Sequence, residues 1–160
     1  MRHPEGARYE RRNVAMAEEL FRKVFTVHGG NFDRAGESST EIKDKLKDLN
    51  IDANLVRRAV VIAFEAEMNV VMYANVGTMN FIITDEEICL EISDEGPGIA
   101  DIEQAMQEGF STASDEMREM GFGFGMGLPN IKKNSDFLKI ESDVGKGTRV
   151  FARIRLNTDD

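Results

Sequence analysis

Residues 94–128 read DEGPGIADIEQAMQEGFSTASDEMREMGFGFGMGL and place two clusters of glycine on either side of a charged segment. The first cluster follows directly on an apolar run, Ile88–Ile92. Glycine allows a backbone to take up positive φ, or to approach a ligand without a Cβ in the way. Two such clusters in one small domain predict a ligand that is held largely by main-chain groups.

The composition narrows the class of protein. The 160 residues are 41% hydrophobic and 31% charged, which fits one globular domain with a single core. The net charge of -9 argues against nucleic acid as a partner, because nucleic-acid-binding proteins neutralise phosphates with clustered Lys and Arg. The sequence also offers no polybasic segment that would anchor it to anionic lipid.

The sequence also indicates the compartment. The longest apolar run is far shorter than the ~20 residues of a membrane span, and Met1–Gly6 is polar rather than the start of a signal peptide. The single cysteine, Cys89, lies in a predicted strand, which excludes a disulfide framework. We therefore expect a soluble cytoplasmic protein with no membrane partner.

The N-terminal part of the chain predicts an arm and an edge strand. We expect residues 1–20 to form a weakly ordered or helical arm, because they open with a polar run of mixed charge. Phe21–Val27 alternates apolar and polar side chains, as an edge strand does, and His28-Gly29-Gly30 predicts a turn. A single domain is expected over residues 21–156.

Two helices are predicted next. Phe32–Leu49 carries apolar residues at roughly helical spacing and predicts one amphipathic helix. Leu55–Ala74 has apolar residues around well over half of its circumference, so it predicts a long helix packed on most sides. Asp52 or Asn54 is able to cap that helix.

The C-terminal half predicts four strands and two short helices. Thr78–Thr84 and Glu87–Ser93 are separated by Asp85-Glu86, which is typical of a hairpin with a short turn. The elements that follow are expected to be a helix, a loop, a second helix and two strands: Asp101–Gly109, Phe110–Met120, Leu128–Asn134, Phe137–Ser142 and Thr148–Leu156. Helices and a mostly antiparallel sheet in separate layers predict an α+β fold, a two-layer sandwich with helices on one face of the sheet.

The long predicted helix carries a candidate polar pair. Glu65 and Asn69 are four residues apart and share a face, whereas Glu67 lies two positions from each and points away. Spacing alone leaves two interpretations open: a helix-stabilising pair at the rim of the core, or a functional pair. Asp94 is similarly either a turn-capping aspartate at a strand end or a ligand-binding group.

The second glycine cluster precedes a predicted helix. Gly123, Gly125 and Gly127 would present backbone N–H groups at a helix start, where anions are favoured. A flexible loop readily explains one such glycine but explains three at alternate positions poorly. The cluster is neither a P-loop, since GxxxxGK[ST] is absent, nor a dinucleotide fingerprint, since no GxGxxG follows a strand.

Four motifs in order resemble those of the Bergerat-fold ATPases, the superfamily of DNA gyrase, the ninety-kilodalton heat-shock chaperone, histidine kinases and mismatch-repair ATPases. They cover about residues 60–150 and read Glu65-x-x-x-Asn69, Asp94-x-Gly96-x-Gly98, Gly123-x-Gly125-x-Gly127-Leu128 and Gly145-x-Gly147-Thr148. DEGPGIADIEQAMQEGFSTA, GMGLPNIKK and ESDVGKGT are most similar to the anti-sigma factor and serine-protein kinase family, in particular to its switch kinases. Two departures are Tyr73, where several members have His, and a longer loop over residues 114–120.

The resemblance implies a site for ATP and Mg²⁺. It implies that Asn69 supplies the metal ligand and that Asp94 accepts a hydrogen bond from the adenine amine. Gly96, Gly98 and Thr148 would lie near the base, and the phosphates would lie at Gly123, Gly125, Gly127 and Leu128. Arg118, Lys132 and Lys133 are weaker candidates for phosphate contact, because each is more simply explained as a solvated charge.

Glu65 is the candidate catalytic base, since it lies one helical turn from the implied metal ligand. The resemblance implies a serine/threonine protein kinase whose substrate is a small STAS-domain protein, related to the anti-sigma-factor antagonists. The alternative is an ATP-gated anti-sigma factor that sequesters a sigma factor, with a homodimer as its assembly. A gyrase- or chaperone-like motor is disfavoured, because the chain has no room for transducer and dimerisation domains.

Overall fold

The computed structural model describes residues 17–111 and 126–156. Its strands are β1 (Glu19–His28), β2 (Val76–Thr84), β3 (Glu87–Asp94), β4 (Phe137–Asp143) and β5 (Gly147–Arg155). They form one sheet in the order β1-β2-β3-β5-β4, in which every neighbouring pair is antiparallel. The predicted edge strand, central hairpin and C-terminal pair of strands are all confirmed.

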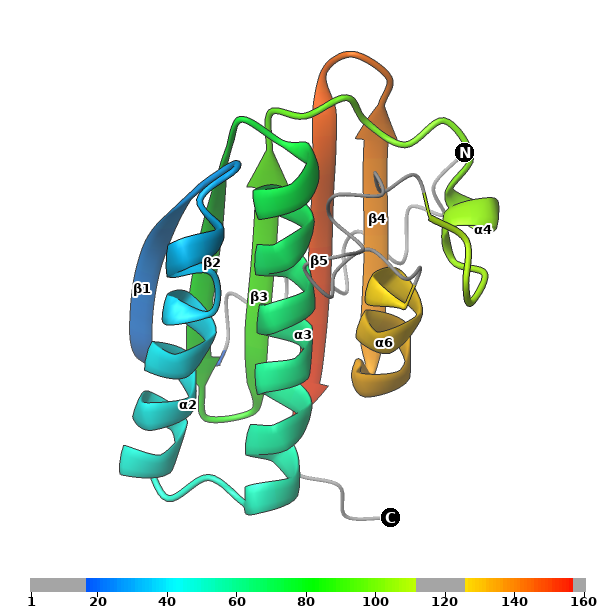
Figure 1. Ribbon diagram of the computed structural model, residues 1–160. Coiled ribbons are helices and arrows are strands. Elements are labelled where there is room, and N and C mark those ends of the chain that lie inside the picture. Colours follow the sequence, from blue (N-terminus) through cyan, green and yellow to red (C-terminus); the bar gives the residue numbers. More distant parts are fainter. Residues whose placement is uncertain (1–16, 112–125, 157–160) are drawn as a thin grey trace.

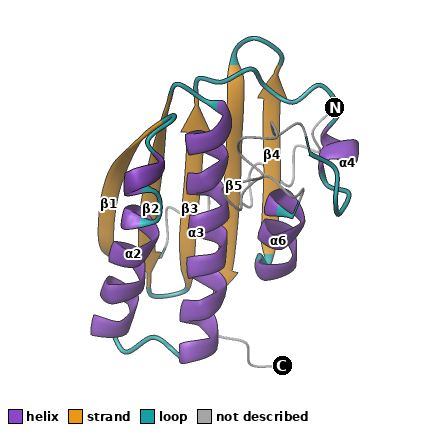
Figure 2. Ribbon diagram, in the orientation of Figure 1, coloured by secondary structure: helices purple, strands orange, loops and turns teal. Residues whose placement is uncertain are grey.

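The helices lie on one face of the sheet (Figure 1, Figure 2). They are the 3₁₀ turn η1 (Phe32–Arg34), α2 (Glu37–Asp48), α3 (Ala53–Tyr73), α4 (Ile102–Ala105) and α6 (Gly127–Asn134). In Figure 1, α3 crosses the middle of the sheet, with α2 in front of β1 and β2 and α6 in front of β4. This is the two-layer α+β sandwich that the sequence predicts.

Two helix predictions were wrong in extent. The single helix expected over Phe32–Leu49 is divided, because Gly36 takes up φ = 96°, outside the helical region, between η1 and α2. The helix expected over Asp101–Gly109 has only the four residues of α4. It buries no side chain that would stabilise further turns, and the backbone N–H of Gln107 already bonds three residues back, to the carbonyl of Gln104.

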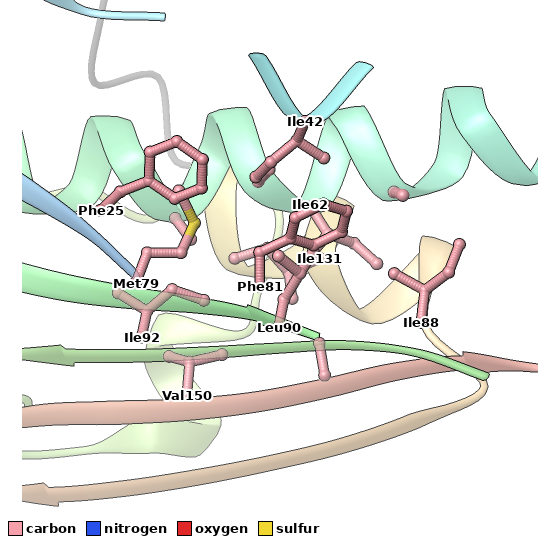
Figure 3. Close-up of a cluster of buried hydrophobic side chains, with 14 of the residues drawn as sticks. Phe25, Ile42, Ile62, Met79, Phe81, Ile88, Leu90, Ile92, Ile131 and Val150 are labelled. Carbon is pink, nitrogen blue, oxygen red and sulfur yellow. The ribbon is translucent and has the colours of Figure 1, made fainter. Parts of the chain in front are cut away.

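Helix α3 organises the core. The carboxylate of Asp52 accepts a hydrogen bond of 3.1 Å from the backbone N–H of Asn54, so Asp52 is the cap of the two candidates. Figure 3 shows the side chains between the helices and the sheet, with Ile62 of α3 and Ile131 of α6 near Phe81 and Leu90. All four are at most 1% exposed. Burial of such apolar surface is the main source of stability, at about 25 cal/mol per Å².

Glu67 is a buried charge with a structural role. It is 3% exposed, and its two carboxylate oxygens accept hydrogen bonds of 3.3 and 3.2 Å from the backbone N–H groups of Ser38 and Ser39. These donors lie in the first turn of α2, which has no side-chain cap of its own. The carboxylate of α3 therefore caps α2 from outside and offsets the cost of its own burial.

None of the helices in the described ranges is both long and apolar enough to cross a membrane.

Candidate functional site

Glu65 and Asn69 meet the first residue of α6. A Cβ atom at Gly127 would lie 3.3 Å from Glu65 Oε2 and 3.3 Å from Asn69 Oδ1. Both side chains are half-buried. The absence of a side chain at position 127 therefore lets the start of α6 lie directly against two of the predicted site residues.

Asn130, which the sequence analysis did not single out, also contacts Glu65. Its Nδ2 donates a hydrogen bond of 3.2 Å to Glu65 Oε1. The residue lies one turn into α6, whose periodicity gives no sign that this amide faces a carboxylate 65 positions earlier. Only the packing of α6 against α3 brings the two groups together.

Within the described residues, the N-terminus of α6 has no side-chain cap. Its N-cap residue, Met126, makes no side-chain cap hydrogen bond, and Pro129 has no N–H group to satisfy. Leu128 is only 9% exposed and belongs to the hydrophobic core. Gly123, Gly125 and Arg118 lie outside the described residues, as does the segment 114–120.

Asp94 ends β3 and holds the start of β5. Its Oδ1 accepts a hydrogen bond of 3.1 Å from the backbone N–H of Thr148. Burial raises the pKa of Asp94, and hydrogen bonds from the backbone N–H groups of Thr148 and Gly96 oppose that rise. A half-buried carboxylate at a strand end, with one oxygen engaged by main chain, suits the reading of an exocyclic amine by its other oxygen.

Two glycines allow close backbone packing between the loop after β3 and the β4–β5 turn. Gly147 has φ = 131°, and a Cβ there would lie 2.0 Å from the carbonyl oxygen of Asp94. Gly98 has φ = 76°, and a Cβ there would lie 2.3 Å from the carbonyl oxygen of Asp143. The loop after β3 and the β4–β5 turn are therefore packed backbone against backbone, which only glycine permits.

Ser142 is a second residue that the sequence analysis missed. Its hydroxyl accepts a 2.7 Å hydrogen bond from the backbone N–H of Ile99 and lies 2.9 Å from the hydroxyl of Thr148. Ser142 stands opposite Thr148 in the β4–β5 register. The predicted C-terminal hairpin could have revealed this contact, because its register pairs Ser142 with Thr148.

The group of Glu65, Asn69 and Gly127 and the group of Asp94 and Thr148 lie at the same end of the molecule. A Cβ at Gly96 would lie 3.2 Å from the Cβ of Ala74, the residue that follows α3. Asn69 lies five residues earlier, about 7.5 Å along a helix axis. In Figure 1 the loop after β3, the β4–β5 turn and the C-terminal end of α3 share the upper edge of the sheet. Asp94 and Asn69 therefore belong to the same end of the molecule.

Other charged features lie away from this site. Lys132 and Lys133 are in the last turn of α6, at the opposite end from Gly127, and Lys133 pairs with Glu108. A groove of about 560 Å³ between α2 and α3, lined by residues such as Lys47, Arg57 and Val60, shares no residue with the predicted site.

Tyr73 is half-buried at the end of α3. Cys89 is a buried free thiol, and burial raises its pKa to about 12.

Comparison with known proteins shows the family of the chain. Residues 52–158 match the family of histidine kinase-, DNA gyrase B-, and HSP90-like ATPases. An anti-sigma F factor of Caldanaerobacter subterraneus subsp. tengcongensis is 31% identical over 133 residues, which are 83% of this chain and 81% of that protein. An anti-sigma F factor of Geobacillus sp. (strain WCH70) is 29% identical over 140 residues, 88% of this chain and 85% of that protein.

The serine/threonine-protein kinase RsbT of Bacillus subtilis is 41% identical over 59 residues, 37% of this chain and 38% of RsbT. The similarity to a serine/threonine-protein kinase and to anti-sigma factors agrees with the anti-sigma factor and serine-protein kinase family that the motifs resemble. Membership of an ATPase family implies a site for ATP. The chain belongs to the family of histidine kinase-, DNA gyrase B-, and HSP90-like ATPases.

Proposed function

We propose that this protein binds ATP with Mg²⁺ and transfers the γ-phosphoryl group to a serine or threonine of a small STAS-domain partner. The observation that carries the proposal is the meeting of Glu65, Asn69 and Gly127. A carboxylate, an amide oxygen and a helix N-terminus lie together there, at the end of the molecule where Asp94 is also placed.

The residues fit a magnesium nucleotide. Mg²⁺ prefers hard oxygen ligands and keeps several waters, so the amide oxygen of Asn69 together with phosphate oxygens is an adequate set. The uncapped N–H groups at the start of α6 suit a phosphate. The space over Gly127 is one that a Cβ would fill. When bound, Mg²⁺ would neutralise charge on the phosphates.

Glu65 would act on the acceptor hydroxyl. Its carboxylate takes the proton of the serine hydroxyl as the bond from that oxygen to the γ-phosphorus forms. The bond between the γ-phosphorus and the β,γ-bridging oxygen breaks, and ADP leaves with the electron pair. Phosphoryl transfer needs mainly positioning and charge neutralisation, to which a general base typically adds a factor of about 10² to 10⁴.

A second function is an ATP-gated anti-sigma factor that sequesters its partner, as a homodimer. It is favoured by one observation. The two anti-sigma F factors match this chain over 81% and 85% of their lengths, whereas RsbT matches over 38%. Both functions place the protein in the cytoplasm, where ATP is available.

Affinity capture with Mg-ATP, followed by phosphoprotein mass spectrometry, separates the two functions. The baits are the wild type, Glu65→Gln and the matched control Glu86→Gln, which changes an exposed carboxylate at the β2–β3 turn, at the far end of β3 from Asp94. A small partner phosphorylated on Ser or Thr by the wild type and the control, but not by Glu65→Gln, supports the kinase. A sigma factor held equally by all three baits, without phosphate transfer, supports sequestration and contradicts the kinase.

A further inference from the structure

We infer that Asn130 is a positioning residue that sets the orientation of the Glu65 carboxylate. The inference rests on the proposed function, because it assigns a partner to the proposed base. The two residues belong to α6 and α3, and the hydrogen bond from Asn130 Nδ2 to Glu65 Oε1 is 3.2 Å long. It is a side-chain contact between the two helices that form the site.

The hydrogen bond gives the two carboxylate oxygens of Glu65 different roles. An ionised carboxylate only accepts hydrogen bonds, so the amide must present its NH₂ group to it. Oε1 is held by Asn130, while Oε2 lies 3.3 Å from the Cβ position of Gly127 at the helix start. Oε2 is therefore the oxygen that faces the proposed phosphate position, and Oε1 fixes the plane of the group.

Asn130 is itself held in place. The Nδ2 of Asn134 donates a 2.8 Å hydrogen bond to the backbone carbonyl of Asn130. The guanidinium of Arg58 bonds the Asn134 carbonyl at 3.1 Å and Asp136 Oδ1 at 3.0 Å. Arg58 and Glu65 are seven residues apart and lie on the same face of α3.

These contacts join α6 to α3 at two points: Asn134 bonds Arg58, and Asn130 bonds Glu65. The donor of Asn130 is thus presented by a helix that is already fixed. Arg58, the charged group on this face of α3, is two turns from Glu65 and is paired with Asp136. Among the described residues, Asn130 donates the hydrogen bond that the Glu65 carboxylate accepts.

The test compares Asn130→Leu, Asn130→Asp and the control Asn54→Ala, an exposed position at the start of α3, by turnover of Mg-ATP. Asn130→Leu removes the donor, and we expect kcat to fall roughly 10- to 100-fold, the size of one hydrogen bond to a charged group. The KM for ATP should change less than about twofold, because the nucleotide does not lose a contact.

Asn130→Asp separates positioning from packing. It keeps the size of the side chain but places a carboxylate against a carboxylate, so we expect a loss at least as large as that of Asn130→Leu. A purely structural role predicts near wild-type kcat for this variant. Asn54→Ala should leave kcat unchanged. Wild-type kcat in both Asn130 variants, or a change confined to KM, would overturn the inference.

A readout without turnover keeps this inference distinguishable from the proposed function. In ¹H–¹⁵N spectra of the full chain, the side-chain NH₂ of Asn130 should shift in Glu65→Gln, while that of Asn134 should not. If Asn130 shows no shift, the contact is refuted whatever the rates are. If Glu65→Gln turns over ATP like the wild type, the proposed base is refuted, and the spectra still decide whether Asn130 holds Glu65.

Discussion

The carboxylate of Asp94 accepts a 3.1 Å hydrogen bond from the backbone N–H of Thr148, although the two residues are 54 positions apart. The bond joins the end of β3 to the start of β5 at the edge of the sheet where the candidate site lies. It occupies Oδ1 with a main-chain donor. Because the carboxylate is half-buried, it carries a stability cost that depends on pH.

Asp94→Asn should remove this pH dependence. Burial raises the pKa of Asp94 above 3.8, so between that value and the native pKa the folded state binds more protons than the unfolded state. The contribution of Asp94 to stability is therefore lost as pH rises through that window. Relative to the wild type, the asparagine variant should gain stability as the pH rises above about 4, measured by urea unfolding. A constant difference across pH would contradict this.

The same substitution should weaken ATP binding. The amide oxygen of Asn can still accept from Thr148, but its NH₂ group then replaces the second acceptor and faces the adenine amine, donor against donor. We expect Kd for ATP to rise roughly 10- to 100-fold, measured by titration calorimetry. Asp48→Asn, at an exposed position on α2, is the matched control. Unchanged affinity for Asp94→Asn would remove Asp94 from the base-reading site.

Asn69→Ala should abolish the contribution of Mg²⁺ to nucleotide binding. The amide oxygen is the proposed protein ligand of the metal, and alanine supplies no replacement. The ratio of ATP affinities with Mg²⁺ and with a chelator should fall to about one, whereas the exposed control Asn54→Ala at the start of α3 should keep the wild-type ratio. A normal ratio in Asn69→Ala would refute the metal assignment.

Gly127→Ala should raise or preserve stability while lowering turnover. Alanine gains up to ~1 kcal/mol over glycine in a helix, and position 127 has no positive φ that would strain it. Its methyl group, however, would lie 3.3 Å from both Glu65 Oε2 and Asn69 Oδ1 and would force them to shift. A small displacement of catalytic groups costs up to ~100-fold in rate. Thermal unfolding and ATP turnover of one preparation test the two effects, and unimpaired turnover would argue against a site at this contact.

Glu67→Ala should destabilise the fold without touching the site. It leaves the N–H groups of Ser38 and Ser39 without their acceptor, and hydrogen bonds to a charged group contribute about 1.5–3 kcal/mol. Glu41→Ala is the control, because the exposed Lys23–Glu41 ion pair should contribute less than ~1 kcal/mol. Equal losses of unfolding free energy for the two variants would show that Glu67 is not a cap.

Much of the fold was open to prediction because it depends on local patterns. The alternation in Phe21–Val27 and the apolar residues of Leu55–Ala74 lie in β1 and α3. The capping aspartate Asp52 and the turn at Asp85-Glu86 lie where the sequence placed them. The failure at Gly36 arose because helical spacing of apolar residues does not reveal a glycine that leaves the helical region. The failure after Ala105 arose because that spacing does not reveal that α4 buries no side chain to stabilise further turns.

The sequence by itself determined the order of the motifs, the family and the candidate pair Glu65 and Asn69, because the helical period puts residues four apart on one face. Only the tertiary structure decided what each carboxylate of α3 does. Glu65 is bound by Asn130 and Glu67 by the N-terminus of α2, although they are two residues apart. Their partners lie 65 and 29 positions away, and the packing of α6 and α2 on opposite sides of α3, not local periodicity, selects them.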